Sequence, residues 1–233
     1  MRLKTRLQTT ALASLLALSA VASANAVSIS GTGSLGSFTG NLTFSATTST
    51  MGTLNISLTN TSPAANSGFI TALVLNNPNN QITSISSFTD APGGGSFSLI
   101  ALTNNGVPGA PNGQFDFGAT TGGNFEGGGT PKAGITVNAS DSFAFSLTGS
   151  NMLALTANSF LAELSTGAAN GGAAALDVRF RGFANGGSDK VVLAGSNGSG
   201  SGSAEGIPVP EPASMALLGV GLAGFGLARR RAK

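Results

Sequence analysis

The sequence predicts an all-β protein whose body is an antiparallel β-sandwich or jelly-roll-like domain, with an apolar segment near each end of the chain. Two observations carry this prediction. Apolar and polar residues alternate in several short runs, which is typical of strands with one buried face. These runs are separated by loops rich in Gly, Pro and Asn, and the chain holds 35 Gly among 233 residues. Many short strands joined by such loops are typical of sandwiches and jelly rolls.

The strand candidates follow one another along the body. Alternation is clearest at 41–46, 53–59 and 143–148, where every second residue is apolar. Residues 69–75 (FITALVL) form a continuous apolar run, which is expected of a strand covered on both faces. The further strand candidates are 96–102, 114–118, 133–138, 176–183 and 190–194. Residues 158–165 (NSFLAELS) are the candidate for a short helix, because their apolar residues would share one face.

Four residue types that carry much of enzyme chemistry are absent from the chain, namely Cys, His, Trp and Tyr. Their absence excludes disulfide frameworks, thiolate nucleophiles, zinc sites built on Cys or His, and Ser-His-Asp triads. It also removes the indole and phenol rings on which sugars and bases often stack. We therefore expect neither a cofactor nor a metal ion.

Two groups of charged residues are the candidates for a site in the body. Asp116 and Glu126 flank a Gly-rich loop, and a glycosidase needs two carboxylates about 5–10 Å apart. Asp177, Arg179 and Arg181 alternate along one predicted strand and so share a face. We interpret the first two as solvated loop acids, and the other three as a solvated sheet face rather than a binding strip. The body is thus predicted to hold no catalytic residue and not to be an enzyme.

Most of the basic charge lies at the two ends of the chain. Between 27 and 208 four basic residues stand against eight acidic ones, so this part has a net charge of −4. Such a charge offers no basic surface for a phosphate backbone. We expect no nucleic-acid partner, and the basic ends need a separate explanation.

Residues 1–26 have the order of a secretory signal peptide. A basic start (MRLKTR) precedes a short apolar stretch (LQTTALASLLALSAVA) and then small residues (SANA). This order predicts export by the Sec translocon and removal by signal peptidase, which cuts after a small-x-small pattern. We expect cleavage after Ala26, with Ala24 as the alternative, so that the body spans 27–194.

The C-terminal part of the chain has a linker and then three parts in a fixed order. Residues 195–207 are rich in Gly and Ser and predict a flexible linker. The final segment, 208–233, begins with a proline motif, continues with an uncharged stretch at 213–228 and ends in a basic tail at 229–233. The motif residues are Val209, Pro210, Glu211 and Pro212, and the basic residues are Arg229, Arg230, Arg231 and Lys233.

The uncharged stretch 213–228 predicts a transmembrane helix. Its 16 residues rise about 24 Å, against about 30 Å of hydrocarbon. Arginine side chains that reach the headgroup region make up the difference. Because a basic end stays cytoplasmic, the body is expected outside the inner membrane, as the N-terminal signal also predicts.

This tail resembles the PEP-CTERM sorting signal of Gram-negative bacteria over about its last 25 residues. The resemblance implies that an exosortase, a membrane-embedded transpeptidase-like enzyme, recognises Pro210, Glu211 and Pro212 and processes the chain there. It also implies that the helix and the basic cluster hold the chain in the inner membrane until then. The alternative is a plain C-terminal anchor with a proline-containing hinge.

The sequence therefore predicts an exported, non-enzymatic surface or extracellular-matrix protein that is anchored only transiently. The resemblance implies a link to exopolysaccharide and to a biofilm matrix. The alternatives are an exported glycan- or ice-binding module, or a polysaccharide-active enzyme, retained by a plain anchor. Glycan recognition usually uses exposed aromatic rings, for which this chain has only Phe. Ice recognition would need a flat Thr-x-Thr array, and we recognise none in the sequence.

Overall fold

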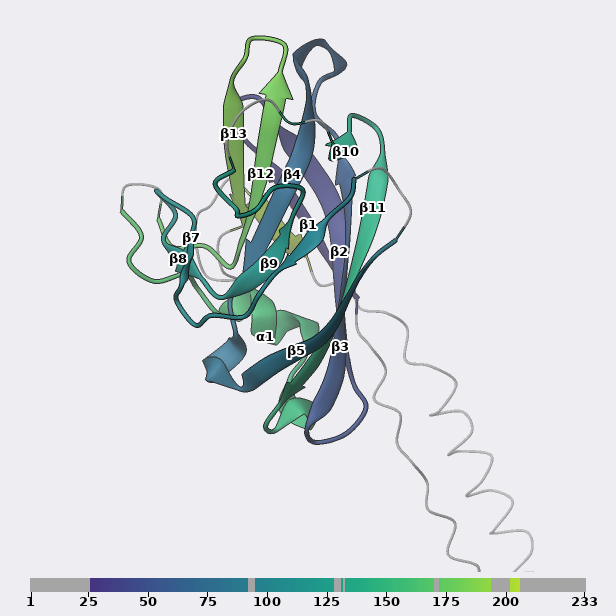
Figure 1. The fold of residues 1–233 in the computed structure, drawn as a ribbon, viewed down its shortest axis with the longest axis vertical. Helices are drawn as coiled ribbons and strands as arrows, with labels where there is room; N and C mark the ends of the chain where they lie inside the picture. The colour runs from purple at the N-terminus through teal and green to yellow at the C-terminus, as the bar shows by residue number, and fades with distance from the viewer. Residues whose placement is uncertain are drawn as a thin grey trace, which may run out of the picture.

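The computed structural model describes residues 26–91, 95–127, 131, 133–169 and 172–193, together with the backbone of 202–205. These residues form two main antiparallel sheets and one short helix, α1 (Ala157–Ala162) (Figure 1). The strands are β1 (Ala26–Thr32), β2 (Ser37–Ala46), β3 (Met51–Asn60), β4 (Ser67–Leu75), β5 (Ile82–Asp90), β6 (Ser98–Ile100), β7 (Val107–Pro108), β8 (Gln114–Phe115), β9 (Phe117–Thr120), β10 (Ile135–Thr136), β11 (Ser140–Gly149), β12 (Leu176–Phe183), β13 (Ser188–Leu193) and β14 (Gly202–Glu205). The 3-10 turns are Ala64–Asn66, Pro78–Asn80 and Met152–Ala154.

The strands divide between the sheets in an order that differs from their order in the chain. The first sheet runs β14-β1-β2-β3-β11-β5, and the second runs β13-β12-β4-β9-β6, with β10 also paired to β4. The hairpin of β7 and β8 forms a small third sheet. The chain thus crosses from the first sheet to the second after β3 and returns to the first sheet for β5. These two crossings enclose the space between the sheets.

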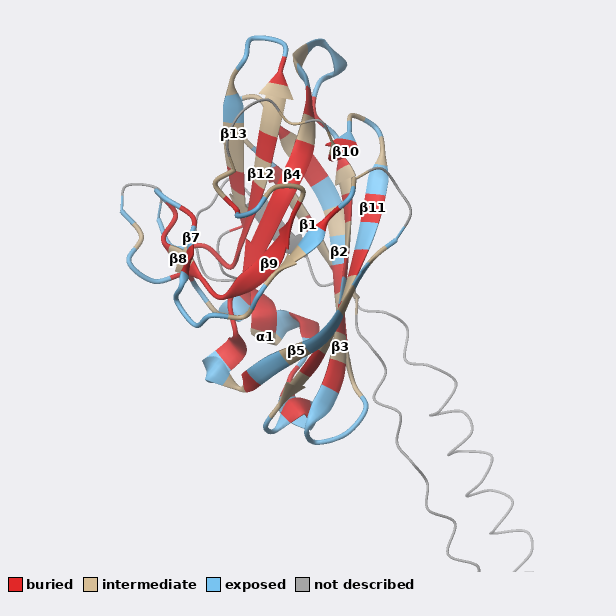
Figure 2. Ribbon diagram, in the orientation of Figure 1, coloured by how far each residue is buried: buried red, intermediate tan, exposed pale blue. Residues whose placement is uncertain are grey.

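Inward side chains of both main sheets form one hydrophobic core. Leu42, Leu54 and Phe143 contribute from the first sheet, and Leu73 and Val178 from the second. Because successive side chains of a strand point to opposite faces, buried and accessible residues alternate along β3 and β11. Figure 2 shows this alternation as red bands, whereas β9 is red along its whole length.

The second sheet is covered on its outer face as well. A second cluster of buried side chains joins outward residues of β4, Ala72 and Val74, to Val107, Phe115 and Phe125 from the segment between β6 and β10. This cover explains why β4 is buried from Ile70 to Leu75. The run at 69–75 was predicted to be covered on both faces, and the structure confirms it.

The all-β prediction is confirmed, since the described chain is mostly antiparallel sheet with one helix of six residues. The predicted segments at 41–46, 53–59, 143–148 and 176–183 lie in β2, β3, β11 and β12, and the described part of the segment at 190–194, residues 190–193, lies in β13. Three strands of the first sheet, β1, β5 and β14, were not predicted. The helix predicted at 158–165 is shorter and begins one residue earlier.

Regular structure also reaches past the predicted body at both ends. Ala26, expected as the last residue of the signal peptide, begins β1 and pairs with Thr43. Within the predicted linker 195–207, Gly202–Glu205 pair as β14 with β1, so that Ser28 lies opposite Glu205.

Candidate functional site

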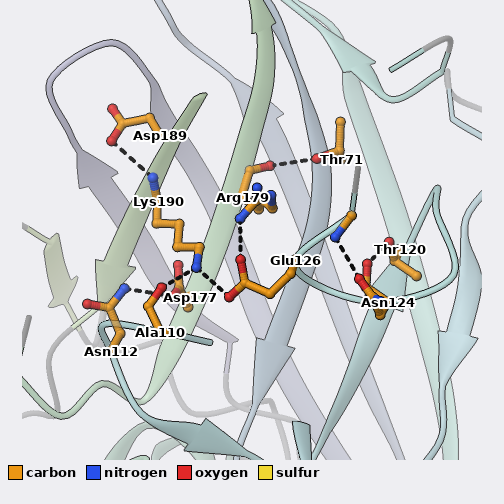
Figure 3. A network of polar contacts seen from close by, with 11 residues as sticks. Thr71, Ala110, Asn112, Thr120, Asn124, Glu126, Asp177, Arg179, Asp189 and Lys190 are labelled. Carbon is orange, nitrogen blue, oxygen red and sulfur yellow. Dashed lines mark hydrogen bonds and ion pairs between the residues drawn. The ribbon is translucent and has the colours of Figure 1, made fainter. Parts of the chain in front are cut away.

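A charged network lies on the outer face of the second sheet (Figure 3). Glu126, in the loop after β9, accepts a hydrogen bond of 2.8 Å from Arg179 on β12 and one of 2.6 Å from Lys190 on β13. Arg179 and Lys190 are directly paired in the sheet. Two positive charges at paired positions destabilise the sheet unless an anion lies between them. Lys190 also donates to the carbonyl oxygen of Ala110, and its amino group lies 5.4 Å from the centre of the Phe125 ring. The carboxylate of Glu126 thus ties the loop after β9 to both β12 and β13.

Asp177 lies under this network and is fully buried. Its Oδ2 accepts a hydrogen bond of 2.8 Å from the side-chain amide of Asn112, and its buried Oδ1 has no partner among the described residues. Burial raises the pKa of Asp177 to about 7, although the Asn112 bond and the charge of Lys190 act in the opposite direction. The solvated face predicted at 177–181 is therefore wrong for Asp177, because the turn between β7 and β8 covers it with Asn112.

Asp116 is also buried rather than solvated. Its Oδ2 accepts a hydrogen bond of 2.6 Å from the backbone N–H of Asn77, and its Oδ1 accepts one from the backbone N–H of Asn105. These bonds fix the corner after β4 and the turn before β7. The prediction of a solvated acid is wrong for Asp116, while Glu126 is half-buried and engaged by Arg179 and Lys190. The two carboxylates that were considered as a pair therefore each serve a separate structural contact.

A third buried carboxylate lies where β5 and β11 approach each other. Asp141 on β11 accepts a hydrogen bond of 2.8 Å from the backbone N–H of Ser142, and Asp90 on β5 accepts one of 2.9 Å from that of Phe97. Burial, and then the nearby carboxylate of Asp90, raise the pKa of Asp141 to about 6. Asp141 Oδ2 and Asp90 Oδ1 are buried and accept no hydrogen bond from the described residues. Nothing in the sequence pattern indicated this pair.

The outer face of the first sheet is the largest polar feature that sequence reasoning missed. It is formed by every second residue of β1 (28 and 30), β2 (39 to 45), β3 (53 to 59) and β11 (140 to 148). All of these residues are Ser, Thr or Asn except Ala144, and we call them the hydroxyl face. The signal was present in the polar half of each alternating run, but only the apolar half was interpreted.

The residues predicted to direct sorting lie outside the described residues. These are Ala24, the motif at 209–212, the uncharged stretch at 213–228 and the basic tail at 229–233. In the part of the chain that the structure describes, no helix has the length and apolar character needed to cross a membrane. Nor do three or more acidic side chains gather there in a way that could hold a metal ion.

Comparison with known protein families identifies the tail. Residues 208–231 match the PEP-CTERM protein-sorting motif. The chain therefore carries this sorting motif, and the resemblance seen in its residues is confirmed. The motif marks an exported protein that is handled at the membrane by an exosortase. Neither the curated proteins nor the solved structures that were compared include a significant match to this chain.

Proposed function

We propose that this chain is an exported, non-enzymatic surface or extracellular-matrix protein that an exosortase processes at Pro210-Glu211-Pro212. The observation that carries the proposal is the match of 208–231 to the PEP-CTERM sorting motif. Its specificity comes from the fixed order of proline motif, uncharged stretch and basic cluster in the sequence.

Each part of the tail has its own physical task in this proposal. Pro210 and Pro212 fix their own φ angles and disfavour helix at the residues before them, which keeps the motif extended for the enzyme. Glu211 supplies one carboxylate for recognition between them. The stretch 213–228 holds the chain in the membrane, and the basic tail keeps its end cytoplasmic.

The buried and half-buried acids of the body already make structural hydrogen bonds or ion pairs, which supports a body without enzymatic activity. General acid-base catalysis needs a carboxyl within reach of a substrate in a cleft. Asp116 accepts two backbone hydrogen bonds, Glu126 bridges two cations, and Asp177 is sealed under the loop by Asn112. Each of these contacts holds a loop in place, which gives these acids a structural role.

The composition of the body supports a place in a hydrated matrix. Charged residues make up only 9% of the chain, against about 25% in an average soluble protein. Hydroxyl and amide groups take their place on the exposed strands, as the hydroxyl face illustrates. Such a surface suits weak, multivalent hydrogen bonding to exopolysaccharide.

The intact mass of the protein recovered from outside the cells of its native host tests the sorting. We expect a C-terminus at or near residues 209–212, with any added mass identifying an attached group. In a Glu211→Ala variant we expect unprocessed protein to accumulate in the inner membrane, whereas the matched Glu163→Ala variant is processed normally. A wild-type product that still ends at Lys233 would overturn the proposal and make the tail a permanent anchor.

A further inference from the structure

The hydroxyl face is an extended uncharged surface on a folded body that carries charge elsewhere. Its residues are half-buried or exposed and come from four neighbouring strands, β1, β2, β3 and β11. We propose that this face is a binding site for a neutral polysaccharide chain. The proposal deepens the matrix role proposed above and rests on it, but it concerns the body alone and holds however the tail is processed.

The register of the sheet aligns the polar side chains in rows across the strands. One row runs through Ser28, Asn41, Ser57 and Ser142, since each is paired with the next. Neighbouring strands lie about 4.8 Å apart, so each row offers a polar group at regular, short intervals. A hydroxyl both donates and accepts hydrogen bonds, and an amide does the same through separate atoms. The rows therefore complement a ligand whose own groups are closely spaced hydroxyls.

Several of these side chains are already oriented by one another. Thr59 and Ser140 share a hydrogen bond of 2.7 Å between their hydroxyl oxygens, and Ser28 donates to Oδ1 of Asn41 at 3.2 Å. Such bonds restrict the rotamers before a ligand arrives, which lowers the entropy lost on binding. The remaining donor and acceptor positions stay available to a ligand, because both bonded partners keep further capacity.

Two shallow depressions hollow the face and adjoin each other. The first, of about 320 Å³, includes Thr43 and Asn55 in its lining, together with the apolar residues Ile56, Phe143 and Ala144. The second, of about 460 Å³, includes Thr39 and Thr59. Asn41 and Ser57 line both depressions, so a single extended ligand can lie across the two.

The absence of charged residues from the hydroxyl face limits which kinds of ligand fit it. The residues that form it include no cation for a nucleic acid or an acidic glycan and no anion for a basic partner, and the acidic residue Glu205 pairs with Ser28 at its edge. The described chain exposes three large apolar side chains, Met51, Leu153 and Leu164, and of these only Met51 pairs with a residue of the face, at one end of it. Protein interfaces are usually anchored by buried apolar and aromatic residues. A neutral, hydroxyl-rich chain is the occupant that matches this surface.

The test is calorimetry of the purified full-length chain with dextran and with galactomannan, two neutral polysaccharides, and with alginate as an anionic one. The variant T39V/T43V/T59V removes three hydroxyls from the face and keeps side-chain shape and strand preference. The matched control, T103V/T136V, removes exposed hydroxyls elsewhere. Circular dichroism of every variant establishes that the sheet is retained.

We expect binding to at least one neutral polysaccharide, no tighter binding to alginate, and an affinity about tenfold lower in the triple variant, from a few lost hydrogen bonds. The control should bind as the wild type does. Binding that is unchanged in the triple variant, that occurs only with alginate, or that fails with both neutral chains would overturn the proposal. Thermal hysteresis without polysaccharide binding would assign the face to ice instead. None of these results depends on the C-terminal mass that tests the sorting.

Discussion

The side-chain amide of Asn112 donates a hydrogen bond of 2.8 Å to Oδ2 of Asp177, which lies 65 residues further along the chain. This bond joins the turn between β7 and β8 to β12 of the second sheet. The carboxyl that it holds is fully buried beside the charges of Lys190, Glu126 and Arg179. The protonation state of Asp177 therefore affects how firmly the turn between β7 and β8 is held.

The free energy of unfolding should fall as the pH rises from about 4 to about 8. Asp141 and Asp177 have folded pKa values of about 6 and about 7, both raised from 3.8. The folded protein keeps these protons at a pH where the unfolded chain has lost them. The resulting stabilisation is complete below about pH 4 and is lost as the pH rises through 6 and 7. Urea unfolding at several pH values, followed by circular dichroism because Trp and Tyr are absent, measures this loss.

The variant Asp177→Asn tests the assignment of this pH dependence. An amide of the same shape carries no charge to desolvate, so the loss of stability between pH 5 and pH 8 should shrink by about 1–3 kcal/mol. The control Glu163→Gln, which changes an acid outside the network, should leave the loss unchanged. A pH profile of Asp177→Asn that matches the wild-type profile would show that this carboxyl is not the titrating group.

The variant Glu126→Ala should destabilise the protein by about 1–3 kcal/mol at pH 7. It leaves Arg179 and Lys190 opposite each other without their shared carboxylate, and both side chains are largely buried, at 13% and 15% exposure. Thermal unfolding should show a lower midpoint than in the comparison variant Glu163→Ala, which removes a carboxylate that accepts one hydrogen bond, from the backbone N–H of Asn79. If the two variants unfold alike, the network contributes little and the loop is held by its apolar contacts alone.

The variant Gly118→Ala should destabilise the protein by several kcal/mol. Gly118 lies in β9, and a Cβ built there would overlap the backbone carbonyl oxygen of Leu73 in β4. The matched variant Gly123→Ala meets no atom within 4 Å and should change stability by less than about 1 kcal/mol. Equal unfolding midpoints for the two variants would contradict this close approach of β4 and β9.

The alternating segments of the body were predictable from sequence because one face of each strand packs on the core. Strand β5 could not be predicted in this way, because its inward residues Ile82, Ile85 and Phe88 are spaced by three rather than by two. Two register shifts against β11 explain that spacing, because each irregularity restores the inward direction of the next apolar residue. A bulge depends on the partner strand, so the period of β5 alone does not reveal it.

The candidate sites were predictable only in part, for a related reason. The tail could be interpreted from its own residues, because the order of its parts is local in the sequence. The burial of Asp177 depends on a loop more than 50 residues away in the chain, which no local pattern encodes. The hydroxyl face likewise becomes visible only when the register places the polar residues of four strands side by side.

The pairing of Ser28 with Glu205 places the beginning and the end of the body beside each other. Paired residues of an antiparallel sheet lie about 5 Å apart, so the chain enters β1 and leaves β14 at almost the same place. The same closeness makes the body a self-contained module, which can be inserted into another chain or repeated in tandem without changing its strand order.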